Sequence, residues 1–260
     1  MIPDLTAHFA AGHKAVNGWC AIPSAITAEI MGRQGFDLMT IDLQHGLIDY
    51  QMALTMLQAL QGLPAPVLVR VPWNEPGIVM KCLDAGFAGV ICPMVNTADD
   101  ARRLVAASRY APLGSRSFGP TRANMVYGSD YVKTANTRVM VLAMIETREA
   151  LANLDDILAV QGVDGVYVGP SDLGLSLGHA PTLDPTAPEV LAAIAHIGTR
   201  TKAAGCIAGI HTGSPAMIRD MLAQGYDFAS LLSDARLFTT AVATQLAAIR
   251  QTTAEVVKGY

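Results

Sequence analysis

Eight short apolar runs, each followed by polar or glycine-rich residues, constrain the fold of this chain more than any other feature. Helix-like stretches lie between them, for example at 26–35, 49–62, 78–86, 98–110 and 214–225. Apolar strands that alternate with helices are typical of a parallel sheet with a covered outer face. The runs are NGWCAI (17–22), DLMTID (37–42), PVLVRV (66–71), GVICPM (89–94), VMVLAMI (139–145), DGVYVG (164–169), CIAGIH (206–211) and DFASLL (227–232).

Eight such units in 260 residues predict a (β/α)₈ TIM barrel, a fold that typically needs roughly 250 residues. A doubly wound open sheet is the alternative. No GxGxxG motif follows the first run, which disfavours the dinucleotide-binding form of that sheet. Because no linker or low-complexity tract divides the chain, residues 1–260 are expected to form a single domain. The one long connection, 95–138, has a length that is often functional.

Composition limits the classes of binding partner and the cellular location that we expect. The chain is 51% hydrophobic and 15% charged, with a net charge of -4. It has no Lys/Arg run, so nucleic acid and anionic membranes are not expected as partners. No signal peptide or membrane-spanning run is evident, and a cytoplasmic location is expected. The four cysteines lack CxxC spacing and are expected to be reduced thiols: Cys20, Cys82, Cys92 and Cys206.

Polar side chains follow several of the apolar runs, where a TIM barrel carries its active site. Runs two, three, five and six end in a base candidate, a fixed cation and carboxylates. Run seven ends in a second histidine. These side chains are Asp42, Gln44, His45, Arg70, Glu146, Asp172, His211, Ser233 and Asp234.

Two of the carboxylates suggest a metal site. Glu146 and Asp172 are one β/α/β step apart, so parallel neighbouring strands would bring them to the same rim. Two hard oxygen ligands suit Mg²⁺ or Mn²⁺, with water and substrate at the remaining positions. The alternative is a rim acid that pairs with a neighbour such as Arg148.

The cation and the base each allow two interpretations. Arg70 lies among apolar residues, and a buried arginine is costly unless it is paired or faces an anion. It is therefore either a structural ion-pair partner or a stabiliser of a developing oxyanion. His45 is either a surface histidine or, with Asp42 three residues earlier, half of a carboxylate–imidazole pair that raises its basicity. His211 is the second candidate.

Several segments, in one order along most of the chain, resemble the class II, metal-dependent pyruvate aldolases of the HpcH/HpaI (hydroxy-ketoacid) group. The resemblance implies a TIM barrel that assembles as a homo-hexamer, a trimer of dimers, with C-terminal helices exchanged between neighbours. The segments are IDLQHG (41–46), VRVPWNEP (69–76), KCLDAG (81–86), PMVNTADDAR (93–102), IETREAL (145–151) and GPSDLGLSLG (169–178).

The resemblance also implies roles for single residues. Glu146 and Asp172 would ligate a divalent metal ion (Mg²⁺, Mn²⁺ or Co²⁺). His45 would be the acid/base residue, supported by Asp42 and by Asp84 of an adjacent subunit. Arg70 would stabilise the enolate. The ketoacid carboxylate would bind at Gly169, Pro170, Ser171 and Asp172.

Two positions depart from the pattern of the group. Met144 stands where many members carry a substrate-contacting glutamine, and Gln44 stands where many carry a glutamate. Neither change removes a metal ligand or the base. Met144 makes its edge of the site more apolar.

The expected activity is reversible aldol cleavage of 4-hydroxy-2-ketoacids, with pyruvate or hydroxypyruvate as the enolate donor and an aldehyde as the acceptor. Lys81 and Lys133 lie in helix-like sequence rather than at strand ends, which disfavours a Schiff-base mechanism. The alternatives are a related metal-enolate lyase, such as an oxaloacetate decarboxylase or a citryl-thioester lyase, and a non-catalytic ketoacid-binding barrel.

Overall fold

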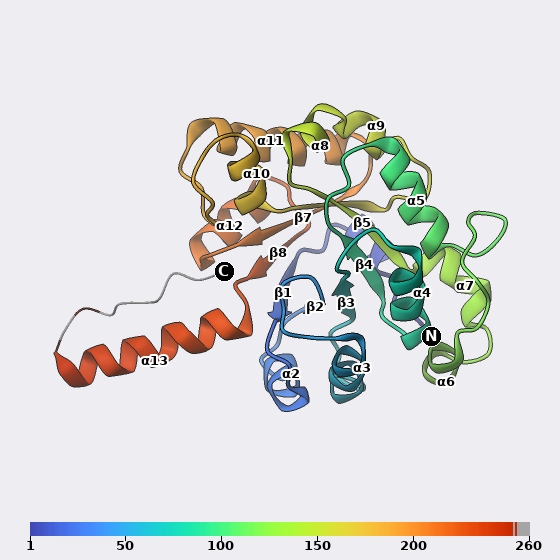
Figure 1. Ribbon diagram of the computed structural model, residues 1–260, viewed down its shortest axis with the longest axis horizontal. Coiled ribbons are helices and arrows are strands. Elements are labelled where there is room, and N and C mark those ends of the chain that lie inside the picture. Colours follow the sequence, from blue (N-terminus) through green and yellow to red (C-terminus); the bar gives the residue numbers. More distant parts are fainter. Residues whose placement is uncertain (252, 254–260) are drawn as a thin grey trace.

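The chain forms a closed barrel of eight parallel strands in sequence order, in which β8 pairs with β1 (Figure 1). The computed structural model describes residues 1–251 and 253. All eight predicted strands are present, each within two residues of its expected ends, and the open-sheet alternative is wrong. The strands are β1 (Ala15–Cys20), β2 (Leu38–Asp42), β3 (Val67–Arg70), β4 (Gly89–Cys92), β5 (Met140–Ile145), β6 (Gly165–Val168), β7 (Ile207–Thr212) and β8 (Phe228–Leu231).

Helices follow each strand and cover the outside of the barrel. Several begin at a side chain that accepts a hydrogen bond from the first turn, such as Ser24, Asp49 and Ser214. The helices are α1 (Leu5–Ala10), α2 (Ala25–Gly32), α3 (Tyr50–Ala59), α4 (Pro76–Ala85), α5 (Ala98–Ser108), α6 (Thr121–Tyr127), α7 (Tyr131–Arg138), α8 (Arg148–Ala152), α9 (Leu154–Leu158), α10 (Pro170–Ser176), α11 (Pro188–Ala203), α12 (Pro215–Ala223) and α13 (Asp234–Arg250).

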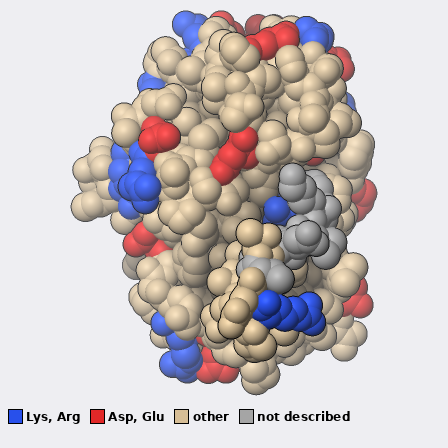
Figure 2. Space-filling model, turned by 90° about the vertical axis from the view of Figure 1, so that its left-hand side faces the viewer, with Lys and Arg blue, Asp and Glu red and all other residues tan. Residues whose placement is uncertain are grey.

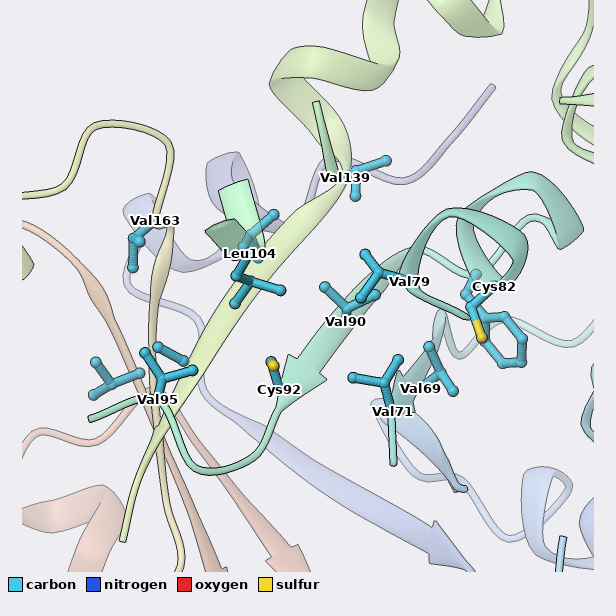
Figure 3. Close-up of a cluster of buried hydrophobic side chains, with 14 of the residues drawn as sticks. Val69, Val71, Val79, Cys82, Val90, Cys92, Val95, Leu104, Val139 and Val163 are labelled. Atoms are coloured by element: carbon cyan, nitrogen blue, oxygen red, sulfur yellow. The ribbon is translucent and has the colours of Figure 1, made fainter. Parts of the chain in front are cut away.

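The apolar core has an outer and an inner part. The outer part lies between strands and helices, where Val69 and Val90 pack near Val79 of α4 and Leu104 of α5 (Figure 3). The inner part fills the barrel itself with side chains such as Trp19, Leu68, Leu142, Tyr167 and Phe228. Leu5 and Phe9 of α1 belong to the inner cluster and pack at the amino end of the strands. There the Phe9 ring is 5.7 Å from that of Phe228, the first residue of β8. The barrel interior is therefore a filled core rather than a channel.

The long connection 95–138 folds into α5, α6 and α7. Since α7 leads directly into the amino end of β5, the last part of this connection lies at the end of the barrel opposite the carboxyl ends of the strands. The side chain of Arg116 turns inward and pairs with Asp84 at 2.6 Å. The connection thus serves packing within this chain.

The distribution of charge on the surface agrees with a chain that has 15% charged residues and a small net charge. Charged side chains of both signs are scattered over the face in Figure 2, with wide uncharged areas between them. Over the described part of the chain, no helix has both the length and the apolar character needed to cross a membrane. The four cysteine thiols are free, as predicted, and those of Cys20, Cys82 and Cys92 are buried.

Candidate active site

A cleft of about 870 Å³ opens at the carboxyl ends of the strands. Its lining contains five of the six side chains that the sequence placed at strand ends two, three, five and six, together with Gly169, Pro170 and Ser171; Gln44 is not part of the lining. The structure thus brings together residues from four separate β/α units. The five side chains are Asp42, His45, Arg70, Glu146 and Asp172.

Asp42 and Arg70 form a buried bidentate ion pair at the floor of the cleft. The Nε and Nη2 atoms of Arg70 donate to the two carboxylate oxygens of Asp42 at 2.8 and 2.5 Å. Burial alone would raise the pKa of Asp42, but the hydrogen bonds and charge of Arg70 bring it below its ordinary value. Arg70 therefore has the structural partner expected of a buried arginine and also faces the cleft.

Asp42 holds the backbone at His45. Asp42 Oδ1 accepts the backbone N–H groups of Gln44 and His45, at 3.0 and 3.3 Å, and Asp42 Oδ2 accepts the indole N–H of Trp19 at 3.3 Å. A direct pair between the Asp42 carboxylate and the His45 imidazole stays a prediction. Burial and the charge of Arg70 lower the pKa of His45, against the opposing effect of Asp42 and Asp172. At neutral pH the ring is an uncharged base.

Glu146 is held by the neighbouring strand. Its Oε1 accepts the backbone N–H of Met94 at 2.7 Å, and Met94 adopts a left-handed backbone with a φ of 54°. Its Oε2 lies so close to Gly169 that a Cβ there would approach within 2.7 Å. Burial, with a further contribution from Asp172, raises the pKa of Glu146 to about 7 despite the Met94 bond. The carboxylate is thus fixed on both sides, and the opposing charge of Arg70 does not offset the effect of burial on its pKa, which suits a site that receives a cation.

The described carboxylates and histidines of the cleft do not make up a complete metal centre. Over the described residues, no cluster of three or more His, Cys, Asp and Glu side chains could hold an ion alone. Glu146 is buried, whereas Asp172 is exposed on the first turn of α10. Two carboxylates facing an open cleft fit a hard divalent ion whose remaining positions are filled by water and substrate.

Three other residues that the sequence proposed for the site have structural contacts of their own. Asp84 lies at the end of α4, outside the cleft, and pairs with Arg116; a role for it in a neighbouring subunit stays a prediction. Asp234 accepts the backbone N–H of Ala21 at 2.8 Å and fixes the loop after β1. Ser233 caps α13.

Sequence reasoning missed two aromatic residues of the cleft. Trp19 is the last residue but one of β1, and the guanidinium carbon of Arg70 is 4.9 Å from the centre of its ring. Tyr167 projects from β6 and also lines the cleft. Alternation along the strands points both rings into the barrel, a signal that was available in the sequence. Lys81 and Lys133 are outside the cleft lining, on α4 and α7.

Comparison with known proteins agrees with this geometry. The model of the HpcH/HpaI aldolase/citrate lyase family matches residues 18–241. The chain is 46% identical to a hydroxypyruvate/pyruvate aldolase of Rhizorhabdus wittichii over 92% of this chain and 95% of the relative. It is 38% identical to a 4-hydroxy-2-oxo-heptane-1,7-dioate aldolase of Salmonella dublin over 87% of both chains.

The fold comparison points the same way. A crystal structure of an HpcH/HpaI aldolase/citrate lyase family protein from Burkholderia cenocepacia J2315 superposes with a TM-score of 0.88 at 30% identity. The match covers 95% of this chain and 98% of that one. Sequence and fold therefore agree over nearly the whole length, and the chain belongs to the HpcH/HpaI aldolase/citrate lyase family.

Proposed function

We propose that this chain is a class II aldolase that cleaves and forms 4-hydroxy-2-ketoacids. Pyruvate or hydroxypyruvate would be the enolate donor and an aldehyde the acceptor, as the name of the Rhizorhabdus wittichii relative suggests. The observation that carries the proposal is the convergence of Asp42, His45, Arg70, Glu146 and Asp172 on one cleft. Residues 1–260 are proposed to form the single domain that carries this activity.

Glu146 and Asp172 would hold the divalent ion, Mg²⁺, Mn²⁺ or Co²⁺. When bound, such an ion supplies Lewis-acid polarisation of the ketoacid and so makes its C3 protons more acidic. Glu146 presents a carboxylate already fixed by the Met94 N–H, so little reorganisation is needed on binding. Asp172, exposed on the first turn of α10, faces the same cleft.

The amino end of α10 is the proposed site for the ketoacid carboxylate. Within the described part of the chain no side chain caps this helix, and it begins with Pro170, which has no N–H of its own to satisfy. The backbone N–H groups of Ser171 and Asp172 are therefore available to an anion. This supports binding of the carboxylate along Gly169, Pro170, Ser171 and Asp172.

Proton transfer is assigned to His45 and charge stabilisation to Arg70. Because the lowered pKa of His45 leaves the ring neutral, it can accept the proton that leaves C3. Arg70 stays charged because a guanidinium keeps its proton at any working pH, and its pair with Asp42 fixes the plane of the guanidinium. Its positive charge, at the cleft, can stabilise negative charge as it develops on the substrate oxygen.

We also propose that the protein assembles as a homo-hexamer, a trimer of dimers. Helix α13 extends away from the barrel in Figure 1. It carries an apolar stripe, defined here as Phe238, Val242, Leu246 and Ile249, whose residues are 68%, 42%, 41% and 78% exposed. Residues at this spacing share one helix face, and a face of this kind is typical of a contact between subunits.

Removal of the metal tests the proposed function. After treatment with a chelator, we expect cleavage of a 4-hydroxy-2-ketoacid to pyruvate to stop. Addition of Mg²⁺, Mn²⁺ or Co²⁺ should restore it, because two protein carboxylates hold an exchangeable ion. Full cleavage by rigorously metal-free protein would contradict the proposal.

A further inference from the structure

His211 lies in the wall of the cleft and has no part in the mechanism above. It projects from the end of β7 and is partly exposed. Its ring and that of Trp19 form a T-shaped pair, with ring centres 4.6 Å apart and planes at 85°. Arg70 also lies against Trp19, with its guanidinium carbon 4.9 Å from the centre of the Trp19 ring. His211 and Arg70 therefore share Trp19 as a neighbour, and all three line the cleft.

A chain of buried hydrogen bonds fixes the His211 ring. Its Nδ1 is 3.0 Å from the Tyr167 hydroxyl, which is 2.6 Å from the Ser230 hydroxyl. Asn17 Nδ2 donates to Ser230 Oγ at 2.8 Å. Asn17, Tyr167 and Ser230 are fully buried inside the barrel. The ring is thus anchored from within the core rather than from the surface.

The tautomer of the ring depends on the order of donors along this chain. Ser230 Oγ accepts a hydrogen from Asn17, and the Tyr167 hydroxyl lies within hydrogen-bond distance of both Ser230 Oγ and Nδ1 of His211. In one order, Ser230 donates to Tyr167 and Tyr167 donates to Nδ1 of His211. A neutral imidazole that accepts at Nδ1 carries its proton on Nε2. Burial and the charge of Arg70 lower the pKa of His211 to about 3, so the ring is neutral at working pH.

The lining of the cleft also contains apolar residues, Ile22, Pro23, Pro181 and Leu183 among them. The segment that carries Leu183 is tied to the end of β7, because Asp184 Oδ1 accepts the backbone N–H of Gly213 at 2.6 Å. A fixed N–H donor within an apolar cleft orients a ligand that carries an oxygen.

We propose that Ser230 donates to Tyr167 and Tyr167 to Nδ1, and that His211 thereby determines acceptor specificity by donating a hydrogen bond from Nε2 to the hydroxyl group of an α-hydroxyaldehyde. The natural acceptor would accordingly be a hydroxylated aldehyde rather than an alkyl aldehyde. This inference rests on the proposed aldolase function. The donor ketoacid is assigned to the Glu146 side of the cleft, so the aldehyde approaches along the Trp19 and His211 wall.

A matched pair of acceptors tests the proposal. Glycolaldehyde and propanal differ by a hydroxyl in place of a methyl group, and each would be added to pyruvate by the metal-loaded protein. We expect kcat/KM to favour glycolaldehyde. His211→Phe should lower that preference by about tenfold, the value of one neutral hydrogen bond. His211→Gln, which keeps an N–H donor, should retain part of it.

Two controls separate the possible outcomes. His13→Gln changes an exposed histidine outside the cleft and should leave the acceptor ratio unchanged. In ¹⁵N spectra of the imidazole rings, His211 should be protonated at Nε2, and Tyr167→Phe should weaken that preference. An unchanged ratio in His211→Phe, or a ring protonated at Nδ1 alone, would overturn the inference. If the metal-loaded parent protein did not catalyse pyruvate proton exchange, the aldolase function itself would be overturned instead.

Discussion

At the scale of single residues, the ion pair between Arg70 and Asp42 links stability to catalysis. Asp42 binds the guanidinium with both oxygens and also holds the backbone of His45. One buried carboxylate therefore orients both the proposed cation and the loop of the proposed base. The two interpretations of Arg70 from the sequence, structural partner and oxyanion stabiliser, are compatible in this geometry.

Replacement of Arg70 should consequently lower both turnover and stability. We expect Arg70→Ala to lower kcat by roughly 10²–10³-fold, by analogy with the loss of an oxyanion-hole donor. Because Asp42 is left buried and unpaired, the free energy of unfolding should fall by about 3–5 kcal/mol. Arg70→Lys should recover only part of kcat, since an ammonium lacks the planar fork. Turnover per folded molecule and urea unfolding would be measured together.

Arg109 provides the matched control for this prediction. It forms a buried pair with Asp164 at 2.6 Å, outside the cleft lining. Arg109→Lys should lower stability and leave turnover per folded molecule near that of the parent protein. A destabilised Arg70→Lys that behaves in the same way would show that Arg70 is structural only.

The buried carboxylate of Glu146 predicts a pH-dependent cost in stability. Its pKa is raised from an ordinary 4.5 to about 7, so the folded protein binds the proton more tightly than the unfolded chain does. Stability is therefore lost as pH rises from about 4.5 to 7. In metal-free protein, Glu146→Gln should raise the free energy of unfolding by about 3 kcal/mol at pH 8 and by far less at pH 5.

Denaturant titrations at the two pH values measure this difference. Added Mg²⁺ should stabilise the parent protein but not Glu146→Gln, because binding to the folded state adds to its stability. Glu149→Gln, at an exposed position on α8, should change the free energy of unfolding by at most about 1 kcal/mol at either pH. A Glu146→Gln effect of equal size at both pH values would contradict the assignment.

At the scale of elements, the strand termini could be predicted and the contacts between them could not. Apolar runs and the polar residues after them predicted the barrel and seven residues of the cleft, because strand burial and chain order are local features of sequence. The N–H of Met94 on Glu146 and the fork of Arg70 on Asp42 join residues 52 and 28 positions apart. Such contacts depend on the register of neighbouring strands, which periodicity does not specify.

The end of β6 offers a test at this scale. Gly169 lets the strand pass Glu146 closely, and a Cβ there would lie 2.7 Å from Oε2. Gly169→Ala should displace the carboxylate and lower both metal affinity and kcat, the latter by roughly 10²-fold for a misplacement of about 1 Å. Gly119→Ala, where a Cβ meets nothing within 4 Å, is the control and should leave both unchanged. Unchanged metal affinity in Gly169→Ala would separate Glu146 from the metal.

At the scale of the whole molecule, the apolar stripe of α13 predicts assembly. Light scattering should give a particle about six times the chain mass of 27.4 kDa. Phe238→Glu should shift the particle to a smaller mass, because a charge would be buried in the contact. Thr240→Glu, at an exposed position on the same helix but off the stripe, should leave the mass unchanged. A monomeric parent protein would contradict the proposed assembly.

Enolate formation at the cleft is the central claim, and exchange of the pyruvate methyl protons in D₂O tests it most directly. The measurement needs no acceptor aldehyde, so it isolates the proton transfer assigned to His45. We predict exchange by the Mg²⁺-loaded protein, none after chelation, and a rate lowered by ~10²–10⁴-fold in His45→Ala that still binds the metal. Undiminished exchange by metal-free protein or by His45→Ala would contradict the account.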